Sequence, residues 1–255
     1  MRWTNLRVVA GCWLFAFALV ADAQQLIIGS GARLDLGSSM VDAGCRDLQL
    51  AGLLDLGTGI LRNVRDVLPG GSVRGGSGTL SLSGDLSLGT SLLAQSGTVR
   101  VTDGCGRSQS RIIGNHQFNR FVADTASGRT LVLPAGGTQF IASALELTGG
   151  VQRLLLRSSA PGSVSYLALA VTGTQLISRV DVQDVGAPVT GQYLAPHLPA
   201  FSDSVDQGNT PRFFLGGDDA IVPVPTLSIT GLLLLILSLV AFTALRPQLF
   251  SRGEA

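Results

Sequence analysis

The chain has 255 residues, with 18 basic and 17 acidic side chains, and only 14% of its residues are charged. Every basic residue is arginine, glutamate occurs only twice, and the mean hydropathy is +0.40. This composition excludes long amphipathic helices with Glu and Lys on their wet faces, a disordered tail, a basic nucleic-acid binder and any chemistry that requires a lysine.

The N-terminus has the pattern of a secretory signal. Arg2 and Arg7 precede a short apolar stretch at residues 8–20, and Ala21-Asp22-Ala23 fits the small-x-small cleavage rule. We therefore expect a signal peptide at residues 1–23 and a mature chain that starts at Gln24. An uncleaved N-terminal anchor is the alternative, but about 13 apolar residues are few for a membrane span.

Residues 24–214 repeat a short unit in which a polar residue lies between two apolar ones and a Gly or another small residue follows. Examples are Leu34-Asp35-Leu36-Gly37, Leu54-Asp55-Leu56-Gly57 and Leu86-Ser87-Leu88-Gly89. Alternation with period two predicts strands with one wet face, and the Gly- and Ser-rich segments between the units predict turns. The sequence therefore predicts an all-β domain.

A β-sandwich and a β-solenoid both accommodate many short strands at close spacing. We favour the solenoid, because the two Leu-Asp-Leu-Gly units begin at Leu34 and Leu54, a spacing that suits one coil, and because aromatic residues are scarce. In a solenoid each coil buries its apolar side against the next coil, so stacking supplies the core. The predicted body is a Gly-rich, β-helix-like solenoid over residues 24–214, followed by a linker at 215–223.

Of the three cysteines, Cys12 lies in the predicted signal peptide. Cys45 and Cys105 then remain in a chain bound for an oxidising compartment, where two cysteines are expected to pair. A disulfide that closes a loop of about 60 residues contributes on the order of 4 kcal/mol in the chain-entropy model. The alternative is two free thiols that lie too far apart to meet.

Candidates for chemistry are few. His116 is expected to be an outward-facing strand residue and His197 a loop residue between two prolines, with general-base or metal-binding roles as the less favoured alternatives. A loose acidic stretch is interpreted as a solvated linker, with weak Ca²⁺ binding as the alternative. Its members are Asp203, Asp206, Asp218 and Asp219.

The best enzymatic constellation is a pair of carboxylates, Asp181 and Asp184, with Arg157 and Arg179 near in sequence. Paired carboxylates can perform acid–base chemistry on polysaccharides. Aspartates are also ordinary residues at strand ends and turns, and we favour that interpretation. The sequence thus leads us to expect no catalytic residues, no metal site and no cofactor.

The C-terminus has the pattern of a membrane span. Residues 229–245 carry no charge, and Arg246 and Arg252 follow them. About 20 apolar residues cross a bilayer, and the positive-inside rule places the basic tail in the cytoplasm and the preceding chain outside. A buried core helix is the alternative, but this segment has no polar face. We expect one transmembrane helix at about residues 229–245.

The tetrapeptide Val224-Pro225-Thr226-Leu227 lies just before this segment, and Gly231 lies at its start. Together with the apolar segment and the basic end, residues 224–255 resemble the IPTL-CTERM sorting tail of exported proteins from Gram-negative bacteria. The chain departs from that pattern at Val224, where Ile is usual, and at Thr230, where Trp is usual. The resemblance implies processing by an exosortase-type membrane transpeptidase; an unprocessed tail would be a permanent anchor.

Several further runs are shared with a second group of proteins. Among them are Gly44-Cys45-Arg46-Asp47-Leu48, Thr102-Asp103-Gly104-Cys105-Gly106, residues 113–121 and residues 134–139. They resemble a recurring domain of exported bacterial surface proteins with adhesin-like β-solenoid repeats. The resemblance implies surface display.

These observations together predict an exported structural or adhesive protein, anchored in the cell envelope or displayed on the surface of a Gram-negative bacterium. Its expected partners are the membrane, the processing enzyme and an extracellular polysaccharide or another surface, but no nucleic acid. The alternative is a β-helix lyase or hydrolase that acts on polysaccharide.

Overall fold

A computed structural model describes residues 25–88, 92–93 and 96–215. The predicted signal peptide and its cleavage site, nearly all of the linker, the sorting motif and the apolar C-terminal segment lie outside these residues. The described chain is an all-β solenoid of about eight turns, which confirms the predicted fold class of the body. No helix in these residues is long and apolar enough to cross a membrane.

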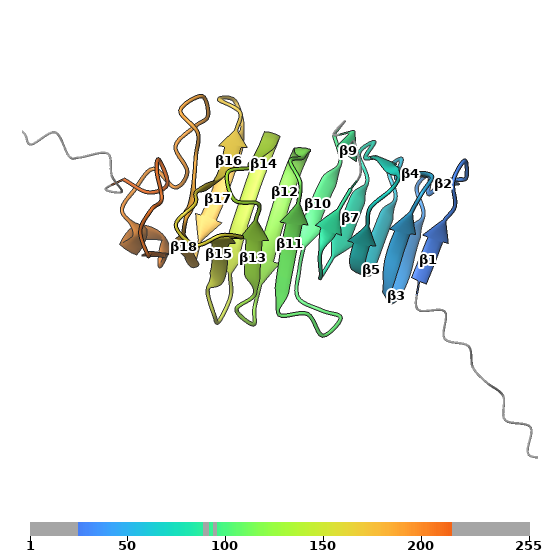
Figure 1. Cartoon of the computed structure of the whole chain (residues 1–255), viewed down its shortest axis with the longest axis horizontal. Helices are drawn as coiled ribbons and strands as arrows, with labels where there is room; N and C mark the ends of the chain where they lie inside the picture. Colours follow the sequence, from blue (N-terminus) through green and yellow to red (C-terminus); the bar gives the residue numbers. More distant parts are fainter. Residues whose placement is uncertain (1–24, 89–91, 94–95, 216–255) are drawn as a thin grey trace, which may run out of the picture.

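The strands are short and follow one another with few residues between them (Figure 1). In chain order they are β1 (Gln25–Ile28), β2 (Arg33–Asp35), β3 (Met40–Leu50), β4 (Leu53–Asp55), β5 (Ile60–Leu68), β6 (Ser72–Arg74), β7 (Thr79–Leu82), β8 (Leu86–Ser87), β9 (Leu92–Leu93), β10 (Thr98–Val101), β11 (Gln109–Ile113), β12 (Gln117–Thr125), β13 (Thr130–Leu133), β14 (Thr138–Gly149), β15 (Leu154–Ser158), β16 (Ser165–Leu169), β17 (Thr174–Ser178), β18 (Val180–Gln183), β19 (Val185–Gly186) and β20 (Val205–Asp206).

The coils have three sides, and all strand pairs between successive coils are parallel. Side A stacks β2, β4, β6 and β9 and continues through the first parts of β12 and β14 to β16 and β19. Side B stacks the first parts of β3 and β5, then β7, β10, the later parts of β12 and β14, and β17. Side C stacks β1, the later parts of β3 and β5, then β8, β11, β13, β15, β18 and β20.

The coil length is regular at first and then grows. Leu34 pairs with Leu54, so the two Leu-Asp-Leu-Gly units are stacked one coil apart, as their spacing predicted. Ile60 pairs with Thr79 and Thr79 with Thr98, so these two successive coils have the same length. Further along, Ala144 pairs with Thr174, which makes that coil much longer. The C-terminal coils carry the extra residues in their longer strands and loops.

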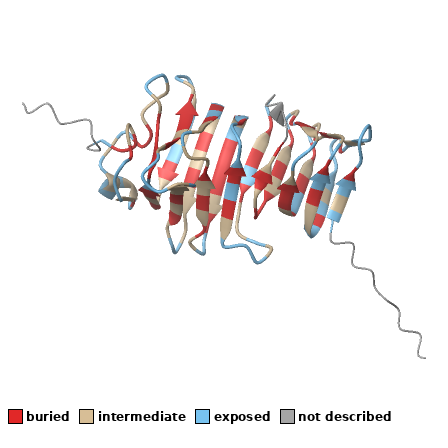
Figure 2. Ribbon diagram, in the orientation of Figure 1, coloured by how far each residue is buried: buried red, intermediate tan, exposed pale blue. Residues whose placement is uncertain are grey.

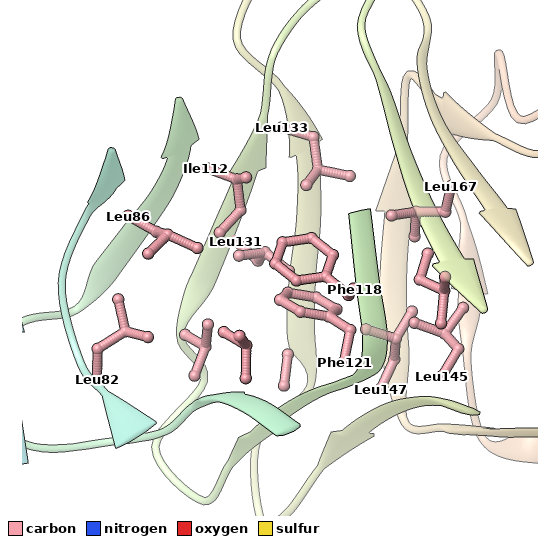
Figure 3. Packing of buried hydrophobic residues seen from close by; sticks show 14 of the residues in the cluster. Leu82, Leu86, Ile112, Phe118, Phe121, Leu131, Leu133, Leu145, Leu147 and Leu167 are labelled. Carbon is pink, nitrogen blue, oxygen red and sulfur yellow. The ribbon is translucent and has the colours of Figure 1, made fainter. Parts of the chain in front are cut away.

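The core is a column of stacked aliphatic side chains, because the two apolar residues of each apolar-polar-apolar unit point inward and the polar residue between them points outward. Leu54, Leu61, Leu80 and Leu131 are fully buried. The aromatic pair Phe118 and Phe121 fills the column in the middle of the molecule, with ring centroids 4.7 Å apart (Figure 3). The scarce aromatics therefore lie where the coils become larger.

Glycines stack at the corner that follows each side A strand in the regular coils. Backbone N–H groups connect the corners, from Thr58 to the carbonyl of Gly37 and from Ser77 to that of Gly57, at 2.7 and 2.8 Å. A Cβ on Gly76 would lie 2.1 Å from the Gly57 oxygen, and Gly76 has a φ of +50°. Corners this close, in a left-handed conformation, require glycine.

The two ends of the solenoid differ (Figure 2). At the C-terminal end, residues 187–215, including the 3₁₀ turn η1 (Pro199–Ser202), cover the last coil, and Leu194 and Phe213 are fully buried there. At the N-terminal end, the first coil runs from β1 to the first part of β3. Core residues of this coil, Leu26, Leu34 and Val41, are only partly buried.

Candidate functional site

The most elaborate side-chain arrangement surrounds a segment that we call the strap, residues 102–108 between β10 and β11. A coil as long as the one from Thr79 to Thr98 would place residue 105 opposite Leu86, but Ile112 occupies that position. This coil therefore holds additional residues. In Figure 1 the corresponding loop below β11 bends towards the N-terminal coils, so the insertion runs along the solenoid axis, outside the stack.

The tip of the strap is bound to an early coil by a disulfide. Cys45 and Cys105 are joined, with their Cα atoms 5.1 Å apart, which confirms the predicted pair. Cys45 lies in the coil of β3, and two further coils separate it from the coil of β10. Three coil steps amount to about 14 Å. Without the additional residues, Cys105 would lie that far from Cys45.

Polar contacts fasten the strap along its length. Arg107 forms an ion pair with Asp66, whose carboxylate also accepts the backbone N–H of Asp85 at 2.7 Å. At the base of the strap, the Asp103 carboxylate accepts the backbone N–H groups of Ala126 and Ser127 at 2.7 and 3.0 Å. The strap therefore links the regular N-terminal coils to the turn that precedes β13.

Arg129 lies fully buried beneath the strap. Its guanidinium donates to the backbone oxygens of Ser83 and Arg107, and its Nε lies 3.5 Å from Asp103. Burial lowers the pKa of Arg129, and the negative charge of Asp103 opposes this shift. Burial alone would raise the pKa of Asp103, but hydrogen bonds from its neighbours, including Thr125, hold it below its ordinary value. An arginine keeps its proton in proteins, so Arg129 and Asp103 form a structural ion pair.

An open pocket of about 310 Å³ lies beside the strap on side C. Its lining is polar and contains two guanidinium groups and one carboxylate; the residues are Asp85, Gly106, Arg107, Ser108, Gln109 and Arg111. Asp85 accepts the backbone N–H of Arg111 at 2.9 Å, so this carboxylate helps to join two coils. The pocket holds one acid rather than the pair that acid–base hydrolysis requires.

Charged side chains on the outer surface form ion pairs between adjacent coils. Six ion pairs of the described residues join an arginine on one coil to an acidic residue on the adjacent coil: Arg33–Asp55, Arg62–Asp42, Arg65–Asp47, Arg100–Asp124, Arg120–Glu146 and Arg157–Asp181. Each exposed pair contributes little to stability by itself, but the pairs offset the charges of the residues that they join.

The expectation that His116 is an outward-facing strand residue is wrong. His116 lies between β11 and β12 with only 7% of its surface exposed. Its Nε2 donates to the Ile113 carbonyl at 2.8 Å, and burial lowers its pKa. The ring also contacts Phe118. The residue turns inward because the neighbouring carbonyl satisfies its N–H, so His116 is a neutral packing residue. His197 is a loop residue, as expected, with its ring edge-on to Phe201.

The two carboxylates of the best enzymatic constellation have separate structural partners. Asp181 is bound by Arg157 at 2.6 Å, across two paired strands of side C. Asp184 lies buried at the corner after β18, where it accepts the Asn209 side chain and the backbone N–H of Gly162. The hydrogen bond from Asn209 is the main reason why the pKa of Asp184 lies below its ordinary value. Each carboxylate therefore holds neighbouring coils or loops together.

The residues of the acidic stretch also have separate partners. Asp203 pairs with Arg153 and Arg179, and Asp206 accepts the Gly208 backbone N–H and the Thr210 hydroxyl. Asp218 and Asp219 lie outside the described residues. In the described part of the chain, no cluster of three or more His, Cys, Asp or Glu side chains is arranged to hold a metal ion.

Compared with known proteins, the chain matches no protein-family model, no curated protein and no solved structure. The fold and the contacts of the described residues are therefore the basis for the functional argument.

Sequence reasoning missed the strap and the buried Arg129. The signal for the strap was present, because the additional residues at 102–108 interrupt the regular coil period and include Cys105. Arg129 had no comparable signal, since a single arginine after a Gly looks like an exposed turn residue. Only stacking places its side chain beneath the strap.

Proposed function

We propose that this protein is an exported, non-catalytic structural or adhesive element of a Gram-negative cell envelope. The solenoid is a stiff spacer whose outer rows of Ser, Thr, Asp and Arg contact a polysaccharide or another surface. The C-terminal apolar segment holds the chain at the inner membrane until an exosortase-type transpeptidase processes it near Val224 to Leu227.

The observation that carries this proposal is the disulfide of the strap. Cys45 and Cys105 are 60 residues apart and are joined through the additional residues of the strap. A structural disulfide is stable in an oxidising compartment, which a chain reaches by export. The paired Arg–Asp surface and the engaged carboxylates support a structural role, since few charged groups are left to converge on a substrate.

The direct test is the intact mass of the protein isolated from the envelope of its native host. We expect a chain that begins at Gln24, contains one disulfide and ends near Val224–Leu227, with an added mass from an acceptor molecule. A mass that runs from Gln24 to Ala255 would establish a permanent anchor and eliminate the processing step. A mass that includes residues 1–23, with Cys12, Cys45 and Cys105 all present as free thiols, would eliminate export.

The enzymatic alternative has its own test. The purified chain is incubated with a panel of acidic and neutral extracellular polysaccharides, and new reducing ends or unsaturated sugars are measured. We expect none above background. The structural proposal would be contradicted by turnover that disappears in Asp181→Ala while the disulfide and the β-sheet circular dichroism spectrum are unchanged.

A further inference from the structure

The first coil has strand edges that no described strand pairs with. β1 pairs with β3, β2 with β4 and the first part of β3 with β5, all on the same side of the coil. The opposite edges of these three segments point away from the stack, at the end of the molecule (Figure 1). Unpaired edges are templates for another strand, and proteins normally block them with Lys, Pro, bulges or covering loops. Residues 25–42 contain neither Lys nor Pro.

The apolar surface at this end points to a docking role. The inward residues Leu26, Leu34 and Val41 are only partly buried, although their equivalents in the next coil, Leu54 and Leu61, are fully buried. On the outer side of the same coil, Ile27 and Met40 are 63% and 58% exposed. Residues 187–215 bury the equivalent surface at the C-terminal end. One more coil of similar sequence would complete the N-terminal end.

The charges of β2 are complementary to those of β2 in a second copy of the chain. β2 is Arg33-Leu34-Asp35, with the two charged side chains 52% and 53% exposed. When two copies of this strand pair antiparallel about Leu34, Arg33 of each copy lies opposite Asp35 of the other, and opposite charges on facing residues stabilise such a pair. Within its own chain Arg33 also donates to Asp35 and Asp55, at 3.1 and 2.8 Å, and a guanidinium has enough N–H groups to bind Asp35 of a second copy as well.

The remaining sides fit the same arrangement. A two-fold axis through the middle of β2 exchanges sides B and C, so β1 of one copy stacks on residues 40–42 of the other. Ile27 and Met40 are the exposed apolar residues of these two sides, and the partly buried Leu26, Leu34 and Val41 extend the core of each copy towards the other. Two like ends meet in this way and the contact closes as a dimer. The irregular segment 187–215 lies over the last coil, so the two ends of the described chain are unlike and the two-fold contact joins like ends.

We infer that the N-terminal end of the solenoid is a homophilic docking surface, whose partner is the same end of a second copy of this chain. The inference rests on the proposed function, because cleavage after Ala23 leaves Gln24 directly before β1. The two-fold axis places the solenoids end to end, with their C-terminal segments pointing in opposite directions. Copies anchored on two facing surfaces therefore meet at their free ends, and the contact joins the surfaces.

Three short strands form an interface smaller than the standard of about 800 Å² per partner, so a single contact is expected to be weak. Many contacts between two surfaces act together and compensate for this weakness. The appropriate test is therefore clustering of surfaces. The full mature chain is reconstituted through its own C-terminal segment into phosphatidylcholine vesicles, and clustering is followed by light scattering.

The decisive variants are Arg33→Asp and Asp35→Arg. Wild-type vesicles should cluster, and vesicles with either variant alone should cluster at least about tenfold more slowly, because like charges then face each other twice. Mixing Arg33→Asp vesicles with Asp35→Arg vesicles should restore clustering, since every facing pair is again of opposite charge. The matched controls Arg100→Asp and Asp124→Arg alter an exposed ion pair in the middle of the solenoid and should cluster like the wild type.

A second measurement leaves the charges unchanged. Leu34→Cys brings two thiols together at the two-fold axis, so clustered vesicles treated with a mild thiol oxidant, which accepts the two electrons, should yield a disulfide-linked dimer on a non-reducing gel. Val151→Cys, whose parent residue is 87% exposed but remote from β2, should not.

Three results would overturn the inference: wild-type vesicles that stay dispersed, single variants that cluster like the wild type, or a mixture of the two variants that stays dispersed. A mass showing that residues 1–23 are retained, with clustering only after their removal, would assign the edge to the chain's own N-terminus instead. Failure of the export proposal is seen separately in the envelope mass measurement, because vesicle clustering does not depend on how the chain reached the surface.

Discussion

The two halves of the solenoid are stabilised in different ways. From β1 to β10 the coils are short and nearly equal in length, their corners are stacked glycines and their inward residues are almost all aliphatic. From β12 onward the coils lengthen, the core gains Phe118 and Phe121, and an irregular segment closes the end. The regular half is open at its end, and the irregular half is closed.

This difference shows what regularity provides and what it leaves open. Short coils of similar sequence stack with close corners, and each can pair with any other. The outer strand edges of the first coil can therefore pair with strands of another coil. The larger coils have loops long enough to fold over the end and bury Phe213. The strap joins the two halves, since it holds Cys45 and Asp66 on one side and the turn at Ala126 on the other.

The largest expected effect comes from removing the disulfide. The double variant Cys45→Ser/Cys105→Ser should lose about 4 kcal/mol of unfolding free energy, because the unfolded chain regains the freedom of a loop closed over 60 residues. Chemical denaturation followed by circular dichroism measures the loss. Reductant should lower the wild type to the level of the variant and leave the variant unchanged; a wild type insensitive to reductant would contradict the clamping role of the strap.

The closed and open ends should respond differently to loss of an apolar side chain. Phe213→Ala removes a fully buried ring from the C-terminal cover and should cost about 3–4 kcal/mol, whereas Leu34→Ala, at the partly buried open end, should cost about 1 kcal/mol. Denaturation at low protein concentration gives both values. Equal losses would mean that the two ends are equally well covered.

Two glycines with similar φ values allow the cost of backbone strain to be measured separately from the cost of disturbing the corner stacking. Gly37 and Gly76 have φ values of +56° and +50°, but a Cβ on Gly37 meets nothing, whereas one on Gly76 meets the Gly57 oxygen at 2.1 Å. Gly37→Ala should therefore cost about 1 kcal/mol, from φ alone, and Gly76→Ala about 3 kcal/mol, because the corner must also move. A thermal unfolding series tests the ranking, and similar costs would argue against close corner stacking.

The smallest expected effect is the loss of folding stability at acidic pH. The hydrogen bonds and charge of Arg65 hold the pKa of Asp47 below its ordinary value of 3.8, and the Asn209 amide does the same for Asp184. Because the folded pKa is the lower one, each carboxylate stabilises the fold above about pH 4 and loses this contribution as the pH falls through its folded pKa. Asp47 is partly exposed, which limits its contribution to below about 1 kcal/mol.

Salt distinguishes these two carboxylates. Asp47→Asn should destabilise the fold less at high salt, because salt already weakens the Asp47–Arg65 pair. The effect of Asp184→Asn should depend less on salt, because the hydrogen bond from the neutral Asn209 amide contributes more to its lowered pKa than the charge of Arg157 does. Stability measured between pH 2 and 5 at two ionic strengths gives the comparison. If the two variants showed the same salt dependence, the proposed difference between Asp47, held by an ion pair, and Asp184, held mainly by a neutral amide, would be wrong.

Much of this architecture follows from local rules. Period-two alternation around small residues predicts strands with one wet face, and the recurrence of Leu-Asp-Leu-Gly at Leu34 and Leu54 predicts the coil length that pairs these two residues. The Cys45–Cys105 pair follows from counting cysteines under the expectation that the chain reaches an oxidising compartment. These features depend on neighbours in sequence or on simple arithmetic, so a single sequence suffices.

Other features depend on which residues stacking brings together. His116 turns inward because the Ile113 carbonyl is there to accept its N–H, and Arg129 is buried because the strap and three oxygen acceptors surround it. Asp181 and Asp184 are close in sequence, yet one faces Arg157 and the other a corner. Their partners lie at least 22 residues away along the chain, so periodicity alone does not identify them.

By itself the sequence determined the strands, the coil length and the disulfide, because each arises from alternation, repetition or the number of cysteines. Only the tertiary structure decided how the additional residues at 102–108 are used, which charges pair across coils, and that one end of the stack is covered while the other is open. The physical reason is that stacking energy belongs to contacts between coils, and those contacts exist only after the chain has wound.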